Sequence, residues 1–502
     1  MLAVVRTVPT ARRLLDVAEL FAGDTRVDLR WAVDRGSALG GGARDVLTAR
    51  RIRPLPWGKA ARRPWHLVLA ASENSPLDRL GAPVLLLPHG AGHGKGMAPE
   101  RLARCGPAAI GLAHSADAAR LASLSPAVGA ATRVVGDPCW DRLTASRHRR
   151  AAYRRALGVG DARLVVLSST WGPLSLFSRH TGLAARLTAE LPWDSWRVAL
   201  VLHPGVRAQH GEDAVARWLR PALDRGLLLL DADDEWRAGL VAADAVLGDH
   251  GSVTLYSAAL GTPTAFACFG WEEVDPETAI ARLGRRHGRF DADGPVLKQL
   301  VDLAGEPGDD RLADQVFAHQ GTSLDRIADV AYELLRLPRP RRGVAPIAVP
   351  IPRAAHPVPT SWWFTTRDTG SGLTVDRYPV SESMPPGARL LAHVYDPDPR
   401  HPTAATVVVG TADLAEYPGA YVAVEGSTIR VRGEGVVDAV DVVPAICEVD
   451  PALEPALDLG PALDPALVGA ALHTWVFQLG RPVPADLRVN GSLVRLAASP
   501  RR

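Results

Sequence analysis

A histidine follows a short apolar run in the segment LLLPHGAGHGKG (85–96). An unperturbed imidazole has a pKa near 6.5, so His89 could take a proton from a hydroxyl group at neutral pH. A glycine at position 90 would let the backbone approach a ligand closely. We therefore predict that His89 is catalytic and that Gly90 and Lys95 lie on the side of an acceptor substrate. The alternative is that these residues only shape a turn.

The same segment is not a P-loop. The pattern G-x-x-x-x-G-K-[ST] requires glycine at position 89 and a hydroxyl residue at position 96, where this chain has His89 and Gly96. Any phosphate group must therefore be held by other parts of the chain.

Two further segments place polar residues at the ends of predicted strands. VVLSSTWGP (165–173) brings Ser169 and Thr170 beside backbone N–H groups that could line a phosphate or nucleotide site. VALVLHPGV (198–206) ends in His203 after five apolar residues. We predict that Ser169 and Thr170 bind a nucleotide donor and that His203 is catalytic. The alternatives are an ordinary helix N-cap for the hydroxyls and a core histidine with satisfied hydrogen bonds.

The fourth segment, AVLGDHGSVTLYSAALG (245–261), reads as a strand, a polar turn and a helix of small residues. The first N–H groups of a helix lack partners within the helix and carry partial positive charge, so they form an anion site. Asp249, Gly251, Ser252 and Thr254 are therefore predicted to bind the donor. Asp249 or Ser252 could instead only cap the helix, and the two interpretations do not exclude each other.

These segments need elements that bring them together. In the first half, short apolar runs alternate with helical patterns, which indicates βαβ units and a parallel sheet. Strands are predicted at 2–5, 27–33, 66–71, 84–87, 109–112 and 133–135.

The pattern restarts after Gly136-Asp137-Pro138, with strands predicted at 164–167, 197–202, 226–230, 245–247 and 264–267. Two α/β units in succession predict two Rossmann-like domains, 1–138 and 139–336, that face a cleft. Ligands of such sheets bind beyond the carboxyl ends of the strands, where all four polar segments are expected.

The rest of the chain changes character. A Pro- and Arg-rich stretch at 337–360 predicts an extended linker, since proline at this density disfavours helices and sheet interiors. Residues 361–502 predict a β-rich accessory domain, with a type I′ hairpin at Asn490-Gly491. The repeat DPALEPALDLGPALDPAL (450–467) is interpreted as a surface spacer.

Composition limits the classes of function. The 502 residues carry 57 basic and 55 acidic side chains, a net charge of +2, which gives no general argument for nucleic-acid binding. The four cysteines lie far apart in the sequence, so neither a disulfide framework nor a structural zinc site is expected. No apolar run of about 18 residues predicts a transmembrane helix. We expect a cytoplasmic protein, with peripheral contact at the inner membrane face left open.

The segments, taken in order, resemble the CDP-glycerol glycerophosphotransferase-like branch of the GT-B glycosyltransferase superfamily. The stretches that carry this resemblance span residues 1–335: Pro88-His89-Gly90, Gly136-Asp137-Pro138-Cys139-Trp140-Asp141, Ser169-Thr170-Trp171-Gly172, Leu202-His203-Pro204 and Asp249-His250-Gly251-Ser252. The resemblance implies a GT-B fold and a metal-independent transferase without a cofactor. Its substrates would be CDP-glycerol or a nucleotide sugar and an acceptor hydroxyl, such as one on a cell-wall or lipid-linked glycan.

By this resemblance His89 would be the general base. The activated oxygen would attack the donor's β-phosphorus or the anomeric carbon of a sugar, while His203, Ser252 and Thr170 hold the phosphates.

Two departures from the family keep other functions open. Gly172 stands where the family has arginine, and no arginine precedes His203, so two planar phosphate-binding groups are absent. This favours a catalytically inactive scaffold that binds a nucleotide or a protein. The ending Leu260-Gly261-Thr262-Pro263 also resembles sugar-nucleotide 2-epimerases, which would be expected to carry more acids in the cleft.

Overall fold

A computed structural model describes residues 1–34, 36, 41–91, 98–230, 234–309, 311–341, 343–353, 356–411, 413–433, 435–443 and 463–498. Lys95, predicted on the acceptor side, lies outside these residues. The chain divides into two compact units. The first contains 1–184, 197–223 and 227–356, and the second contains 185–196, 224–226 and 357–502.

The first half of the first unit is a parallel six-stranded sheet with strand order β2-β1-β3-β4-β5-β6. Its strands are β1 (Leu2–Val5), β2 (Arg30–Val33), β3 (Val68–Ala70), β4 (Val84–Leu86), β5 (Ala109–Leu112) and β6 (Thr132–Val134). Its helices are α1 (Val8–Ala18), α2 (Gly41–Ala49), α3 (Trp57–Ala60), α4 (Pro99–Cys105), α5 (Ser115–Leu124) and α6 (Pro126–Ala130). Alternate residues of β1 enter different cores, Leu2 and Val4 on one face and Ala3 and Val5 on the other. Helices therefore cover both faces, as expected for strands that are apolar throughout.

The second half is a five-stranded sheet with order β11-β10-β7-β8-β9. Its strands are β7 (Arg163–Ser169), β8 (Trp196–Leu202), β9 (Leu228–Leu229), β10 (Ala245–Gly248) and β11 (Thr264–Phe266). Strand β10 pairs in parallel with both β7 and β11, and β8 pairs in parallel with β9. The helices of this half are α7 (Pro138–Ala145), α8 (Arg150–Ala156), α9 (Leu176–Arg179), α10 (Leu183–Glu190), α11 (Pro204–His210), α12 (Glu212–Asp224), α13 (Glu235–Ala242), α14 (Ser252–Ala259), α15 (Ala279–Arg286), α16 (Val296–Ala304) and α17 (Leu312–Val316).

Both strand orders contain a point where the direction of winding reverses. In the first sheet it lies between β1 and β3, and in the second between β7 and β10. Doubly wound sheets bind their ligands at such switch points, beyond the carboxyl ends of the strands. The segments after β7 and β10 are two of those that the sequence singled out.

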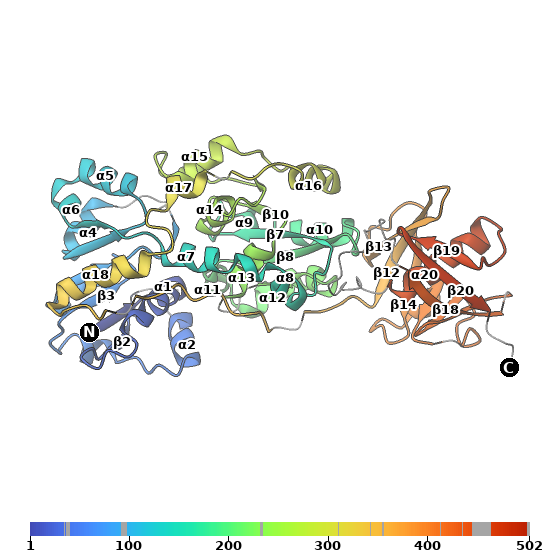
Figure 1. Ribbon diagram of the computed structural model, residues 1–502, viewed down its shortest axis with the longest axis horizontal. Coiled ribbons are helices and arrows are strands. Elements are labelled where there is room, and N and C mark those ends of the chain that lie inside the picture. The colour runs from blue at the N-terminus through green and yellow to red at the C-terminus, as the bar shows by residue number, and fades with distance from the viewer. Residues whose placement is uncertain are drawn as a thin grey trace, which may run out of the picture. The chain divides into compact units, whose positions relative to one another are not determined.

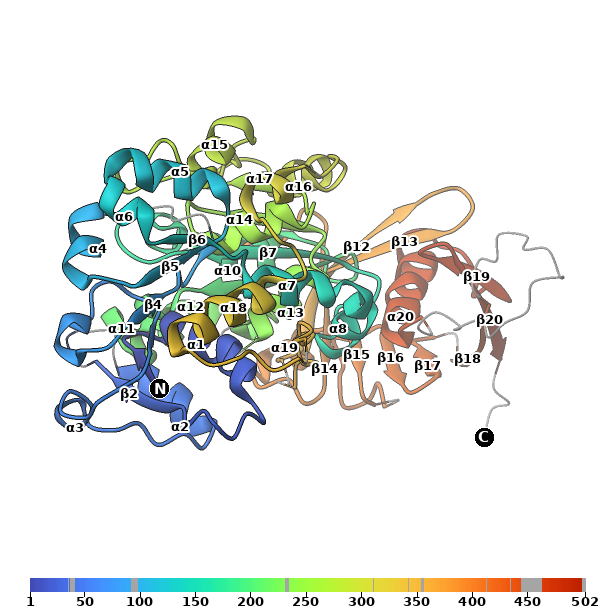
Figure 2. The same cartoon turned by 60° about the vertical axis from the view of Figure 1, so that its left-hand side comes forward.

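Helix α18 (Ser323–Leu335) returns to the first sheet, beside α1 and β3 (Figure 1). Its buried side chains, among them Ile327, Ala331 and Tyr332, belong to the same core as β1. The range 139–336 predicted for the second domain therefore ends in a helix that packs on the first (Figure 2).

The described part of the predicted linker contains neither helix nor strand before residue 361. It is nevertheless anchored to the second half of the first unit. Val349 is fully buried, its N–H donates to Ser146 Oγ at 2.8 Å, and its carbonyl accepts from Tyr153 at 2.6 Å. The segment is therefore not a free spacer at this point.

The second unit is built on a closed nine-stranded barrel, counted over the described residues, with order β12-β13-β19-β20-β18-β17-β16-β15-β14. The strands are β12 (Ser361–Asp368), β13 (Leu373–Pro379), β14 (Arg389–His393), β15 (Val407–Val409), β16 (Val422–Glu425), β17 (Thr428–Val431), β18 (Gly435–Val443), β19 (Asp486–Val489) and β20 (Ser492–Ala498); the helices are α19 (Arg400–Ala404) and α20 (Pro465–His473). Asn490 and Gly491 have φ angles of 50° and 85°, as a type I′ turn requires. Arg377 of β13 bonds Asp194 bidentately at 2.7 and 2.9 Å, which joins segment 185–196 to this unit.

The prediction that residues 450–467 form a surface spacer is wrong for the last three residues of that range. Pro465–Leu467 form the first turn of α20, and Leu467 is buried in the core of the barrel domain. Residues 450–462 lie outside the described chain. The fold class is otherwise as predicted: two Rossmann-like α/β domains and a β-rich third domain.

No described helix has the length and apolar character needed to cross a membrane.

Candidate functional site

His89 follows β4 and presents a fixed tautomer. Its Nδ1 lies 2.8 Å from the carbonyl oxygen of Ala71, at the end of the neighbouring strand β3. Because a carbonyl oxygen only accepts, Nδ1 must carry the proton, which leaves a lone pair on Nε2. The residue is exposed to solvent on one side, but desolvation by the protein atoms around it lowers its pKa. This effect outweighs the opposing effects of its hydrogen bond to the Ala71 carbonyl and of the charge of Glu73. His89 is therefore neutral near pH 7 and can accept a proton.

The N-terminus of α14 lies next to His89. A Cβ atom on Gly90 would stand 3.0 Å from Ser252 Oγ, so glycine allows this close approach. The helix begins at Ser252 after Gly251, and no side chain among the described residues caps it. Its first N–H groups and partial positive charge can therefore face an anion.

Asp249 lies beneath this turn and does not line the cavity described below. Its Oδ2 accepts from the N–H groups of Thr170 and Leu176, both at 2.8 Å, and its Oδ1 accepts from Gly251 at 3.0 Å. The residue is fully buried, and burial raises its pKa against these bonds. The structure thus gives Asp249 a role in holding the loops after β7 and β10, in place of the predicted contact with a donor.

Thr254 is also fully buried and absent from the cavity wall, so the predicted donor contact is not available to it. Its Oγ1 lies 3.4 Å from Ser168 Oγ, and its side chain occupies the space that a Cβ on Gly248 would need. Ser169 reaches the wall, but its hydroxyl accepts from Phe177 N–H at 2.9 Å and donates to the carbonyl of Thr170 at 2.8 Å.

His203 presents the opposite tautomer to His89. It caps α11, and its Nδ1 accepts from the N–H of Gly205 at 2.9 Å, so in the neutral ring the proton lies on Nε2. Its ring stacks with Trp171, with centroids 6.2 Å apart. His203 can therefore donate a hydrogen bond where His89 can accept a proton.

His250, in the turn before α14, has both ring nitrogens engaged. Nδ1 accepts from Gly270 N–H at 3.1 Å, and Nε2 lies 3.4 Å from Glu273 Oε2. It borders the cavity but orients the turn instead of offering a base.

One cavity of about 1280 Å³ joins these groups within the first unit. The predicted site residues that line it are His89, Gly90, Ser169, Thr170, His203, Gly251 and Ser252. The two halves of the first unit thus share one hollow at the carboxyl ends of both sheets, which confirms the predicted cleft.

Sequence reasoning missed the charged residues of the wall. Among the described residues, three acids and six arginines line it: Asp45, Glu73, Glu212, Arg6, Arg12, Arg13, Arg101, Arg207 and Arg237. Two signals could have found some of them. Glu73 follows the end of β3, just as His89 follows the end of β4. Arg207 lies one helical turn after His203. Arg207 also brings a guanidinium to the cavity wall that holds His203.

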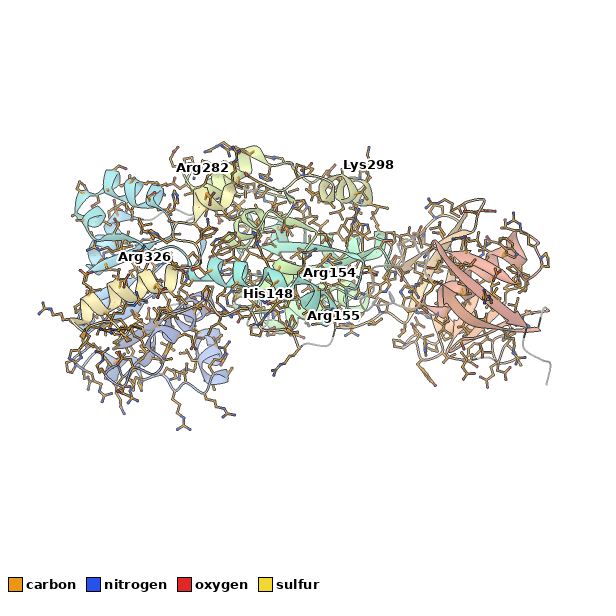
Figure 3. All side chains as sticks on the ribbon, viewed as in Figure 1. His148, Arg154, Arg155, Arg282, Lys298 and Arg326 are labelled. Carbon is orange, nitrogen blue, oxygen red and sulfur yellow. The ribbon has the colours of Figure 1, made fainter. Side chains whose placement is uncertain are left out.

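Two arginines of helix α8, outside the cavity, have structural partners. Arg150 and Arg154 of α8 bond the two carboxylate oxygens of Asp244 at 2.6 and 2.8 Å, while Arg155 is exposed (Figure 3). Segment 147–155 is therefore in part a surface ion-pair network.

Within the described ranges, no three His, Cys, Asp or Glu side chains come together in a way that could hold a metal ion.

No family model and no curated protein matches the chain. Solved structures that resemble it include Staphylococcus aureus MnaA with UDP, at 13% identity over 68% of this chain and 98% of that one, with a TM-score of 0.44. The wall teichoic acid polymerase TagF gives 11% identity over 67% and 89%, with a TM-score of 0.44. Anabaena HepE with UDP and glucose gives 13% over 66% and 100%, with a TM-score of 0.39. These likenesses are distant, and the proposals below rest on the geometry of the cavity.

Proposed function

We propose that the cavity binds a nucleotide-activated donor and that the chain transfers a glycerophosphate or glycosyl group from it to an acceptor hydroxyl. One observation carries this proposal. The lone pair on His89 Nε2 and the uncapped N-terminus of α14 belong to one cavity, at the strand ends of two doubly wound sheets.

The reaction follows from the two tautomers. His89 Nε2 takes the proton of the acceptor hydroxyl as the oxygen attacks, so that imidazolium forms on a ring held by the Ala71 carbonyl. For a glycerophosphate donor, the new bond joins this oxygen to the β-phosphorus while the bond to CMP breaks. For a sugar donor, the bond forms at the anomeric carbon and a nucleoside diphosphate leaves with the electron pair.

The donor's phosphates would lie against the second half of the unit. The N–H groups of α14, the hydroxyl of Ser252, Thr170 and the Nε2–H of His203 supply hydrogen bonds, and Arg207 adds charge. Such donors stabilise negative charge as it grows on the leaving group. In this proposal they do the work that a divalent metal does in other transferases.

A charge placed at the helix N-terminus tests donor binding. Ser252→Asp would put a carboxylate where the phosphate is proposed to lie. The helix dipole then stabilises the fold by about 0.3–1 kcal/mol, while repulsion weakens donor binding. Ser115→Asp is the matched control, because Ser115 is the first residue of α5, is exposed and lies outside the cavity.

The measurement is calorimetric titration with CDP-glycerol, UDP-sugars and GDP-sugars. Binding of one donor that Ser252→Asp weakens and Ser115→Asp does not supports the proposal. If none of them binds the wild-type chain at millimolar concentration, the proposal fails. Binding without turnover of any offered acceptor would instead favour an inactive nucleotide-binding scaffold.

The three acids of the wall support a second candidate, a sugar-nucleotide 2-epimerase. Asp45, Glu73 and Glu212 line the cavity with His89, so proton-transfer groups are more numerous than the sequence indicated. An epimerase working through proton removal at C2 would introduce deuterium there from D2O, even without an acceptor. Deuterium at C2 of an offered UDP-N-acetylhexosamine would favour this candidate over the transferase.

A further inference from the structure

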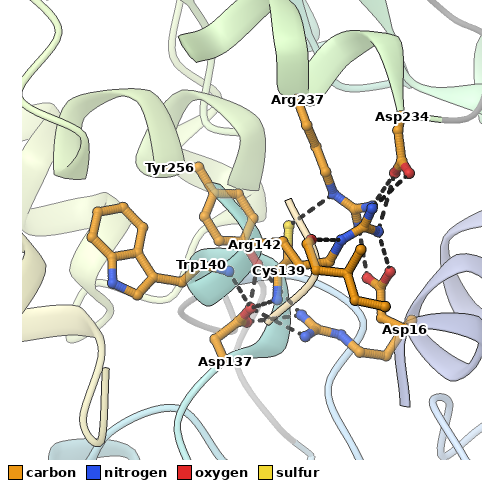
Figure 4. Close-up of polar contacts among 10 residues, drawn as sticks. Asp16, Asp137, Cys139, Trp140, Arg142, Asp234, Arg237 and Tyr256 are labelled. Carbon is orange, nitrogen blue, oxygen red and sulfur yellow. Dashed lines mark hydrogen bonds and ion pairs between the residues drawn. The ribbon is translucent and has the colours of Figure 1, made fainter. Parts of the chain in front are cut away.

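Helix α1, which packs on the first sheet, is joined to the second half of the first unit by buried ion pairs (Figure 4). Arg13 of α1 donates to Asp137 Oδ1 at 3.1 Å and to Oδ2 at 2.8 Å. Asp137 in turn caps α7, accepting from the N–H groups of Cys139 and Trp140 at 2.7 and 3.0 Å. The side chains of Arg13 and Asp137 are only 4% and 2% exposed, so this bidentate pair is fixed in direction.

The helix that carries Ser252 belongs to the same cluster. Tyr256 of α14 donates its hydroxyl proton to Asp137 Oδ2 at 2.9 Å and lies 3.4 Å from Arg13 Nη2. It stands four residues after Ser252, one turn along the same side of the helix. One phenol thus joins the helix of the proposed phosphate site to both α1 and α7.

A second contact lies one turn further along α1. Asp16 accepts from Arg142 of α7 at 2.5 Å and from Arg237 of α13 at 2.7 Å, and both arginines also bond Asp234. Arg13, Cys139, Tyr256 and Arg237 all border the cavity.

The charges of the cluster balance. Its members are Arg13, Arg142, Arg237, Asp16, Asp137 and Asp234. Buried ion pairs add little net stability compared with apolar packing, and in some proteins they fix the arrangement of the parts they join. Here the ion pairs join α1, which begins at the cavity wall, to α7 and α13. The hydrogen bond from Tyr256 to Asp137 adds α14, whose N-terminus lies at the same cavity.

We propose that Tyr256 is a positioning residue, which holds the N-terminus of α14 in register with α1 and so with the His89 side of the cavity. This inference rests on the proposed function, because the register matters for a ligand that touches both sides. Tyr256 itself need not touch the ligand. Without its hydroxyl, the Arg13–Asp137 pair remains, but α14 is released from it.

The test replaces one hydroxyl group. Tyr256→Phe keeps the ring, which stacks on Phe317 with centroids 5.6 Å apart. Tyr332→Phe is the matched control, since Tyr332 is a buried residue of α18 whose hydroxyl donates to Asp24 at 2.8 Å and which does not border the cavity. Each variant loses one hydrogen bond from a phenol to a carboxylate, and Tyr256→Phe also loses the longer bond that its hydroxyl accepts from Arg13 Nη2.

Two readouts separate positioning from stability. UDP and CDP serve as probes in titrations, and hydrogen exchange followed by mass spectrometry reports on the helices of the free protein. We expect Tyr256→Phe to weaken binding of the probe about tenfold and to speed exchange in α1 and α14 but not in α5, since a hydrogen bond to a charged group is lost. Tyr332→Phe should leave probe binding within about twofold of the wild type, because its hydroxyl lies away from the cavity.

Unchanged affinity in Tyr256→Phe, or unchanged exchange in α1, would overturn the inference. Failure of the wild-type chain to bind either nucleotide would count against the proposed function. The exchange of α1 and α14 in the free variants would still decide whether Tyr256 couples the two helices.

Discussion

Two histidines with lowered pKa values stand in very different surroundings. His89 faces a cavity, and a carbonyl oxygen fixes its tautomer. His473, at the end of α20 in the barrel domain, is 4% exposed, and burial together with the charge of Arg389 lowers its pKa to about 4. Phe364, Tyr421 and Phe477 surround its ring, and its Nδ1 has no hydrogen-bond partner among the described residues.

A lowered pKa alone therefore does not mark a catalytic residue. Burial produces the shift in both places, because a charged imidazole is poorly solvated in either. Of the two, only His89 combines the neutral ring with an oriented lone pair, free volume and a helix N-terminus without a side-chain cap in the same cavity. These differences support the proposed role of His89 and indicate a packing role for His473.

The largest effect on turnover is expected from replacing His89. His89→Asn keeps a donor for the Ala71 carbonyl but removes the base, so turnover should fall by about 10²–10⁴-fold while donor affinity stays within about threefold. His473→Leu should leave turnover unchanged. Equal losses in the two variants, measured in a donor-consumption assay, would contradict the contrast.

The next effect concerns the stability of the barrel domain. The folded pKa of His473, about 4, lies below the unfolded value near 6.5, so its contribution to the stability is complete above pH 6.5. As pH falls from 6.5 to 4, His473 takes up a proton in the unfolded chain but stays neutral in the folded chain. The opening free energy of α20 should drop by about 3 kcal/mol over this window.

Hydrogen exchange of α20, corrected for the intrinsic effect of pH, measures this drop. His473→Leu should remove most of the pH dependence, whereas His89→Asn should not change it. A slope that persists in His473→Leu would show that another group titrates there.

A smaller effect is expected at the junction of the two halves. Gly90→Ala places a Cβ 3.0 Å from Ser252 Oγ, so the serine must move, at a cost of about 1 kcal/mol and with weaker donor binding. Gly182→Ala is the control, since a Cβ atom at that position would meet no other atom within 4 Å. Thermal unfolding measures the change in stability, and calorimetry measures the change in donor binding. If Gly90→Ala and Gly182→Ala behave alike, Ser252 does not lie against Gly90.

The smallest effect is a shift in pH dependence. Since His89 must be neutral to accept a proton and its pKa is lowered by burial, kcat/KM should rise with pH through a midpoint below 6.5 and then level. A midpoint above 6.5 in the pH profile would assign the base to another group.

The sequence predicted those parts of the fold that have local causes. Buried strands such as Leu164–Leu167 and the Asn490-Gly491 turn read directly from apolar runs and turn residues. Helix α20 was missed because a helix buried on nearly all sides lacks the polar stripe that reveals helical periodicity. The first three residues of α20 also lie inside the proline-containing repeat at 450–467.

The site was predictable only as far as single strand ends reveal it. His89 and Ser252 each follow a strand, but their meeting depends on strand order and on the packing of two sheets. Asp249 was assigned to the donor because a sequence shows a carboxylate without showing the three N–H groups that already occupy it. Tyr256 gave no signal at all, since its partners Asp137 and Arg13 are more than one hundred residues away.

Nitrogen NMR of protein labelled with ¹⁵N-histidine shows directly which ring nitrogen of His89 carries the proton and whether a nucleotide binds beside it. The His89 signals are assigned by their loss in His89→Asn. We predict that His89 at pH 7 carries its proton on Nδ1, and that added UDP or CDP shifts its Nε2 signal in the wild-type chain and in Ser115→Asp but not in Ser252→Asp. A proton on Nε2, or a nucleotide that binds without changing this signal, would contradict a cavity shared by His89 and the N-terminus of α14.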